Sequence, residues 1–163
     1  MANMMETGIC RCCFTGHRPE KLKRPTQEIA ADLESEIVTA INDGFTVFIT
    51  GMAKGTDIIA GEIVLRMRDA GHPIQLICAA PYQGFEWSWS KEWKQRYEEL
   101  INKADETHFI CSQFFRGCFQ KRNRWLVDHS EKVIAVYNGS PGGTKNTLDY
   151  AQKKGVEIVA IEG

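Results

Sequence analysis

Residues 45–57 read FTVFITGMAKGTD, and the fold prediction starts from this stretch. Its first six residues are all β-branched or aromatic, as expected for a strand buried in a sheet. Gly51 ends this run, and Thr56 or Asp57 is a favoured residue for capping a helix. The segment therefore predicts a strand, a glycine-containing loop and a helix in direct succession.

The same succession continues along the chain on both sides of this segment. Strand-like runs are predicted at residues 9–15, 45–50, 74–78, 107–111, 133–137 and 156–161. Helices are predicted between them: from Pro25 or Thr26 to Gly44, from Thr56 or Asp57 to Gly71, over the stripe Trp89, Trp93, Tyr97, Leu100 and Ile101, over about 117–130, and from the Gly142-Gly143-Thr144 turn to Lys154. Six strands alternating with five helices predict an α/β fold, a three-layer Rossmann-like domain with a mostly parallel sheet of about six strands.

Length, charge and cysteine content narrow the class of protein. The 163 residues fit one domain, which we expect to span residues 1–163. Lys and Arg number 20 against 21 Asp and Glu, and the net charge of −1 does not favour a general nucleic-acid binder. No apolar run approaches the roughly 20 residues of a membrane span, and residues 1–10 do not resemble a secretory signal. With six cysteines, this favours a cytoplasmic protein with reduced thiols and no membrane contact.

Glycine and polar residues gather in the loops that follow the predicted strands. Ligands of parallel sheets bind at the carboxyl ends of the strands, and helix N-termini attract phosphate. Gly142, Gly143 and Thr144 begin a helix and are followed by Lys145, so we place a phosphate there. The loop from Gly51 through Gly55 ends in Asp57, whose carboxylate would repel an anion but could accept hydrogen bonds from ribose hydroxyls. Alternatively, both loops are plain turns followed by a helix cap.

The loop after the first predicted strand reads Thr15-Gly16-His17-Arg18-Pro19. Arg18 could hold a phosphate with two parallel hydrogen bonds, and His17 could act as an acid or base because imidazole titrates near neutral pH. Alternatively, His17 bonds the backbone and Arg18 pairs with a surface carboxylate. The position of the loop favours contact with a ligand for Arg18.

The predicted helix at about 117–130 is basic. It combines Lys121, Arg122 and Arg124 with Phe119 and Trp125, and Arg116 precedes it. This mixture indicates a small nucleic-acid patch, a contact to a ligand phosphate or a solvated face. Arg122 and Leu126 are neighbours at helical spacing, so we place Arg122 at the rim of the core beside the ligand crevice.

Cys10, Cys12 and Cys13 lie close together in the sequence, but their spacing does not fit a zinc site. In a strand, Cys10 and Cys12 would face one side and Cys13 the other. We therefore predict small buried residues, no metal and no cofactor. No Ser-His-Asp order, nucleophile elbow or phosphate-binding P-loop motif is present.

These segments together resemble one known family. The 15–19 loop, the loop from Gly51 to Asp57, Pro81 with Trp89, residues 122–128 (RNRWLVD) and Gly142-Gly143-Thr144 follow one another as in the YpsA-like branch of the SLOG superfamily. The resemblance spans about residues 13–161. It implies a Rossmann-like domain that binds a nucleotide or nucleotide-derived ligand, with no established reaction. Phe85 stands where this branch often has Gln.

The same superfamily includes the LOG phosphoribohydrolases and the DNA-processing protein DprA. The LOG enzymes carry an arginine four residues before a methionine, and then Pro-Gly-Gly-x-Gly-Thr-x-x-Glu. Here Arg122 precedes Leu126 by four, Lys145 and Asn146 replace the Gly-Thr pair, and Asp149 stands at the glutamate position. Cleavage of an N-glycosidic bond needs a well-placed carboxylate, and Asp is one methylene shorter than Glu.

The sequence thus predicts a module that binds a nucleotide or an ADP-ribose-like molecule, with a regulatory or sensing role. Its expected ligand-binding residues are Thr15, Gly16, His17, Arg18, Gly51, Gly55, Asp57, Arg122, Gly142, Gly143 and Thr144. The first alternative is a LOG-like hydrolase of nucleoside 5′-monophosphates, with Arg122 and Asp149 as catalytic residues. The second is DprA-like binding of single-stranded DNA, which is less favoured. The resemblance to LOG enzymes also implies a homodimer.

Overall fold

A computed structural model describes residues 10–163 of the chain, which form one α/β unit. Ile9, where the first strand was expected to begin, and the remainder of residues 1–9 lie outside the described residues. The strands are β1 (Arg11–Gly16), β2 (Val47–Thr50), β3 (Gln75–Ala80), β4 (Glu106–Phe109), β5 (Lys132–Tyr137) and β6 (Glu157–Glu162). The helices are η1 (Pro19–Lys21, a 3-10 turn), α2 (Thr26–Asn42), α3 (Thr56–Asp69), α4 (Lys91–Lys103), α5 (Cys118–Asp128) and α6 (Gly143–Lys154).

The six strands form one sheet in the order β4-β3-β2-β1-β5-β6, and every neighbouring pair is parallel. The chain builds outward from β1 in one direction and then returns to the other side of β1 with β5. The strand order therefore reverses between β1 and β5. In open parallel sheets, loops separate at such a point and leave a crevice beyond the carboxyl ends of the strands.

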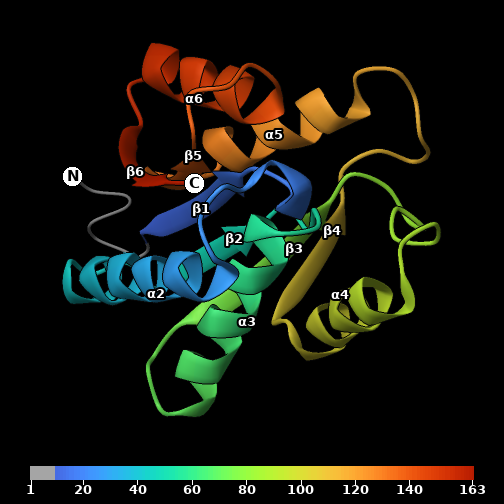
Figure 1. Ribbon diagram of the computed structural model, residues 1–163. Coiled ribbons are helices and arrows are strands. Elements are labelled where there is room, and N and C mark those ends of the chain that lie inside the picture. Colours follow the sequence, from blue (N-terminus) through green and yellow to red (C-terminus); the bar gives the residue numbers. More distant parts are fainter. Residues whose placement is uncertain (1–9) are drawn as a thin grey trace.

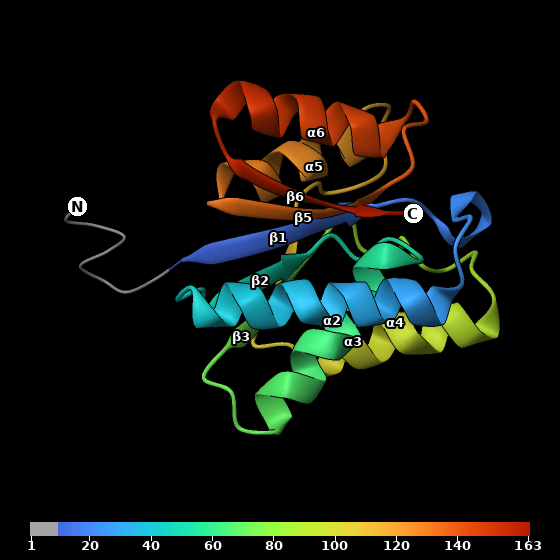
Figure 2. The ribbon, with the colours of Figure 1, turned by 60° about the vertical axis from the view of Figure 1, so that its left-hand side comes forward.

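Helices cover both faces of the sheet, which gives the three expected layers (Figures 1 and 2). Seen nearly edge-on in Figure 2, α5 and α6 lie on one face and α2, α3 and α4 on the other. Each face has its own apolar core. Cys12 packs in the core under α2, α3 and α4, whereas Cys13 packs in the core under α5 and α6. The predicted alternation of these cysteines across the sheet is confirmed.

Three local predictions differ from the structure. Trp89 was expected in the third helix but precedes it, because Ser90 is the N-cap of α4 and its side chain accepts a hydrogen bond from the N–H of Trp93. Gly55, and not Thr56 or Asp57, is the N-cap of α3; it has φ +92°, a conformation that suits glycine. The fourth strand ends at Phe109 and is mostly exposed, as expected for the edge of a sheet.

No helix within residues 10–163 combines the length and the apolar character that a membrane crossing requires.

Candidate functional site

A crevice of about 430 Å³ lies where the loops after β1, β2 and β3 meet the N-terminal halves of α5 and α6. Its position matches the reversal of strand order between β1 and β5. Its walls come from segments far apart in the sequence: Thr15, Gly16, His17, Arg18, Glu20, Lys21, Ala53, Asp57, Phe85, Phe119, Arg122, Asn123, Gly143 and Thr144. The structure thus brings together eight of the eleven residues that the sequence analysis assigned to ligand binding; Gly51, Gly55 and Gly142 are not among these lining residues.

Glycines allow the N-terminus of α3 to approach closely to residues 16–18 at the end of β1, which we call the β1 loop. A Cβ on Gly16 would lie 2.4 Å from Oγ1 of Thr56, a distance that real Cβ atoms do not show. A Cβ on Gly55 would lie 2.9 Å from Cδ of Pro19. The hydroxyl of Thr56 donates a hydrogen bond to the carbonyl of His17, at 3.2 Å, across this junction. Gly55 is therefore a packing position that fixes the β1 loop.

His17 has a defined tautomer in the crevice wall. Its Nε2 accepts a hydrogen bond of 3.1 Å from the backbone N–H of Asn138, so the neutral ring carries its proton on Nδ1. Burial, followed by the nearby charge of Lys21, lowers the pKa of His17 below its ordinary value of 6.5. His17 is thus a neutral imidazole whose Nδ1–H can donate a hydrogen bond.

Gly51 leaves room for two buried charged side chains, those of Asp57 and Arg122. A Cβ on Gly51 would lie 2.9 Å from the Oδ2 atom of Asp57 and 3.2 Å from Cζ of Arg122, so glycine leaves the space that both side chains use. The guanidinium of Arg122 donates a hydrogen bond to the carbonyl of Gly51 and a second, of 2.8 Å, to Oδ1 of Asn123. Arg122 is 5% exposed, and burial lowers its pKa. The predicted place of Arg122 at the rim of the core, beside the crevice, matches the structure.

Asp57 lines the crevice close to Arg122. Its side chain is 6% exposed, and Oδ2 accepts a hydrogen bond of 3.2 Å from the N–H of Ala53. Burial raises the pKa of Asp57 to about 6, although the charge of Arg122 opposes this rise. Asp57 is therefore a carboxylate that can accept from hydroxyl groups at neutral pH and takes up a proton in mildly acidic solution.

The N-terminus of α6 forms the part of the crevice that suits an anion. The N-cap Gly142 has φ +139° and supplies no capping side chain, so the first N–H groups of the helix are not capped by a side chain. Lys21 lies next to it, since its Nζ donates a hydrogen bond of 3.2 Å to the carbonyl of Pro141. The sequence analysis did not include Lys21, although a second basic residue three positions after Arg18 could have indicated it.

Lys145 and Asp149 do not belong to this crevice, contrary to the sequence analysis. They form an exposed ion pair of 2.8 Å between successive turns of α6. The buried face of α6 carries Thr144, Thr147 and Ala151, and at 100° per residue Asp149 is rotated away from that face. Asp149 is thus not placed to act as the catalytic carboxylate, and Lys21 is the cation that lies next to the start of α6, where Lys145 was expected.

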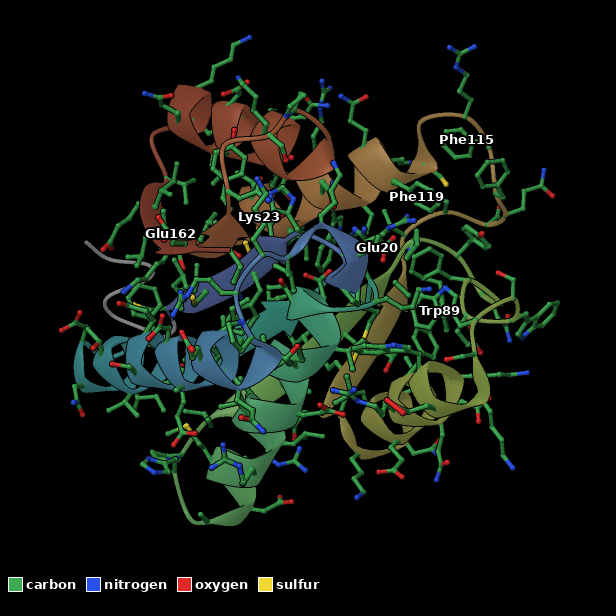
Figure 3. All side chains as sticks on the ribbon, viewed as in Figure 1. Glu20, Lys23, Trp89, Phe115, Phe119 and Glu162 are labelled. Carbon is green, nitrogen blue, oxygen red and sulfur yellow. The ribbon has the colours of Figure 1, made fainter. Side chains whose placement is uncertain are left out.

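Aromatic side chains form another wall of the crevice, which the sequence analysis did not foresee. Phe85 and Phe119 line it, with ring centroids 5.4 Å apart, and Tyr82 stacks against Phe119 at 6.4 Å. Figure 3 shows Phe119 and Trp89 on facing segments at this side of the molecule. At position 85, where the family resemblance implied a glutamine in many members, this chain presents an apolar ring to the crevice.

The remaining basic residues of α5 face solvent. Lys121 and Arg124 are exposed, and the guanidinium carbon of Arg124 lies 5.2 Å from the ring centroid of Tyr150 on α6. Arg116 is also exposed, and it follows the exposed aromatic residues Phe114 and Phe115 in the sequence. Figure 3 labels Phe115 on this loop. The basic helix thus divides between Arg122, which points into the crevice, and an exposed basic surface.

The fold and crevice define a Rossmann-like protein with a crevice at the switch point of its sheet. The chain belongs to the YspA SLOG family, whose YpsA family model matches residues 12–161. This confirms the resemblance that the loop motifs indicated.

Individual proteins are similar to this chain in sequence or in fold. The uncharacterized SPbeta prophage-derived protein YoqJ of Bacillus subtilis is 36% identical over 118 residues, which are 65% of this chain and 69% of that protein. The fold is similar to that of DNA processing protein A from Helicobacter pylori, a structure described for its single-stranded DNA binding mode. The TM-score is 0.68 and the sequence identity 20%, and the match covers 94% of this chain and 66% of that one. DNA processing protein A from Streptococcus pneumoniae gives a TM-score of 0.68 and 20% identity over 99% of this chain and 53% of that one. This chain therefore spans less than two thirds of either DNA processing protein.

Proposed function

We propose that the crevice binds the phosphate of a nucleotide or of a nucleotide derivative such as an ADP-ribose-like molecule. The observation that carries this proposal is Arg122. It is a buried cation, and within residues 10–163 no carboxylate lies within 4.0 Å of it as an ion-pair partner. Asp57, on the other side of the space at Gly51, offsets the cost of burying this charge only in part, because the net effect of its surroundings still lowers the pKa of Arg122; a bound anion would offset the remainder.

The other walls of the crevice suit the remaining parts of such a ligand. The phosphate would lie at the start of α6, where it would contact Arg122, the N–H groups of Gly143 and Thr144, and the cations Arg18 and Lys21 that line the same crevice. Asp57 would accept hydrogen bonds from ribose hydroxyls. The base would pack on the rings that line the aromatic wall.

Titration calorimetry with AMP, ADP-ribose, NAD and a cyclic dinucleotide tests this function. We expect binding of at least one of them, and Arg122→Gln should weaken it by about tenfold or more, because a charge-assisted hydrogen bond contributes about 1.5–3 kcal/mol. Lys145→Gln is the matched control, since it removes a cation of α6 that lies outside the crevice. Equal losses in the two variants, or no binding of any of these ligands to the folded protein, would reject the proposal.

Hydrolysis of a nucleoside monophosphate through Asp149 is not part of this proposal. Asp149 is exposed and paired with Lys145, and the carboxylates that line the crevice are Glu20 and Asp57. A sensing or regulatory module that binds its ligand without turnover agrees better with this arrangement.

A second candidate function is the binding of single-stranded nucleic acid. The exposed Lys121 and Arg124 of α5, with Arg116 and the exposed rings of Phe114 and Phe115, combine cations with stacking surfaces. The similar fold of the Helicobacter pylori DNA processing protein supports this choice of ligand. A gel-shift titration with oligothymidylate should show a logarithmic salt slope of about −0.7 for each phosphate neutralised. No shift at low salt would reject it.

A further inference from the structure

A second cavity, of about 320 Å³, adjoins the β3–α4 loop and α4, and we call it the α4 cavity. The loop separates it from the crevice: Phe85 lines the crevice, whereas the next two residues, Glu86 and Trp87, line the α4 cavity. Tyr97 and Glu98 on α4 and Phe109 at the end of β4 complete its main walls. The α4 cavity is thus a site of its own with its own chemistry.

Two buried polar side chains line the α4 cavity without a hydrogen-bond partner. Glu86 is 7% exposed and Tyr97 is 3% exposed, and among the described residues neither Oε1 of Glu86 nor the Tyr97 hydroxyl has a partner. Leaving a buried carboxylate oxygen unpaired costs free energy, so native proteins rarely do it without a reason. The missing partner of Glu86 is a hydrogen-bond donor, and for a carboxylate the best donor carries positive charge.

The backbone holds Glu86 in this place by successive turns. The N–H of Trp87 donates to the carbonyl of Gly84, and the N–H of Trp89 donates to the carbonyl of Glu86, both at 3.0 Å. Gly84 has φ +93°, and a Cβ there would lie 3.0 Å from the ring of Trp87. The loop is therefore shaped so that the indole of Trp87 lies against the backbone at Gly84, while Trp87 and Glu86 both line the α4 cavity.

The composition of the walls also favours a cation. The charged residues that line the α4 cavity are Glu86 and Glu98, and within residues 10–163 no Lys or Arg lines it. Trp87 is 69% exposed and Phe109 is 43% exposed, which is unusual for such large apolar side chains. Carboxylates next to the faces of aromatic rings are the combination that binds organic cations.

We propose that the α4 cavity binds an alkylammonium group. The carboxylate of Glu86 accepts hydrogen bonds from the ammonium N–H groups, the hydroxyl of Tyr97 offers a further acceptor, and Trp87 and Phe109 pack on the alkyl chain. The group belongs either to a small amine or to a lysine side chain of another protein. This inference does not depend on the function proposed for the crevice.

The probes are n-pentylammonium and spermidine, with neutral 1-pentanol as the matched control, added to the full chain and followed through the indole N–H signal of Trp87 in NMR spectra. We expect both amines to shift this signal and 1-pentanol to leave it in place. A short peptide with one internal lysine between glycines distinguishes the sources, since its binding at lower concentration than spermidine would indicate a protein partner.

Glu86→Gln keeps the shape of the side chain and removes its charge, and it should weaken amine binding by about tenfold or more. Glu92→Gln on α4 is the control, because the side chain of Glu92 is 75% exposed and lies outside the cavity. If the Glu86 variant does not fold, the comparison of pentylammonium with pentanol on the wild-type chain decides. Equal binding of pentylammonium and pentanol, no binding of either amine, or equal effects of the two variants would overturn the proposal.

Discussion

The buried carboxylate of Asp57 predicts a specific dependence of stability on pH. Burial raises its pKa from the ordinary value of 3.8 to about 6. The folded protein therefore binds a proton at Asp57 in a pH range where the unfolded chain has already lost it. The stability that this proton uptake gives is present below pH 3.8 and is lost as the pH rises to about 6.

The size of the effect follows from the same two values. A difference of one pKa unit corresponds to about 1.4 kcal/mol, so the rise from 3.8 to about 6 corresponds to about 3 kcal/mol. Asp57→Asn removes the titration and keeps an oxygen that can accept from the N–H of Ala53. Any effect of this substitution on Arg122 changes the free energy of unfolding of the variant by the same amount at every pH, because a guanidinium keeps its charge throughout this range.

The assay is urea unfolding of the wild-type protein and of Asp57→Asn at a series of pH values between 4 and 7. We expect the free energy of unfolding of the wild type to fall relative to the variant by about 2–3 kcal/mol as the pH rises to about 6, and the difference to stay constant above that. Asp149→Asn, an exposed carboxylate on α6, should give a curve parallel to the wild type. A difference between wild type and Asp57→Asn that does not change with pH would refute the argument that burial makes the charge costly.

Three further predictions concern single residues of the crevice. Gly16→Ala should lower the free energy of unfolding, measured with urea, by about 1–3 kcal/mol, because the new Cβ would lie 2.4 Å from the hydroxyl of Thr56 on α3. Gly143→Ala is the control and should change the free energy of unfolding little, because its Cβ would lie 4.0 Å from the nearest atom. His17 should titrate below pH 6.5 in NMR spectra, and its contribution to stability should fall as the pH drops below 6.5, since protonation of Nε2 ends the hydrogen bond that this atom accepts; a pKa above 6.5 would contradict this. In calorimetry with AMP, Lys21→Met should lower the affinity by several-fold and Lys145→Met should not, and the reverse order would move the anion site away from the β1 loop.

The fold could be predicted because its signals are local and repeated. Each strand and each helix has its own apolar period, and strict alternation leaves few sheet topologies. The opposite faces of Cys12 and Cys13 follow from strand geometry alone, and the place of the crevice follows from strand order. These features do not depend on which side chains that are distant in the sequence contact one another.

The details of the crevice could not be predicted because they depend on contacts between side chains that are far apart in the sequence. Lys145 comes shortly after the glycines at the start of α6, but its side chain pairs with Asp149 one turn further along the helix and does not line the crevice. Lys21, in the 3-10 turn η1, instead contacts the residue Pro141 just before this helix, 120 positions later in the chain. The aromatic wall likewise joins Phe85 and Phe119, which no local pattern connects. In the same way, the role of Gly51 as the space between two buried charges depends on a helix that begins far along the chain.

Backbone chemical-shift mapping with AMP tests whether the crevice at the strand-order reversal binds a phosphate-bearing nucleotide. We expect the amide signals of Gly143 and Thr144 and those of the β1 loop, residues 16–18, to shift together and saturably, and the same shifts to need an AMP concentration about tenfold higher or more in the Arg122→Gln protein. Saturable shifts confined to the exposed basic surface around Lys121 and Arg124, with the α6 N-terminus unchanged, would contradict it.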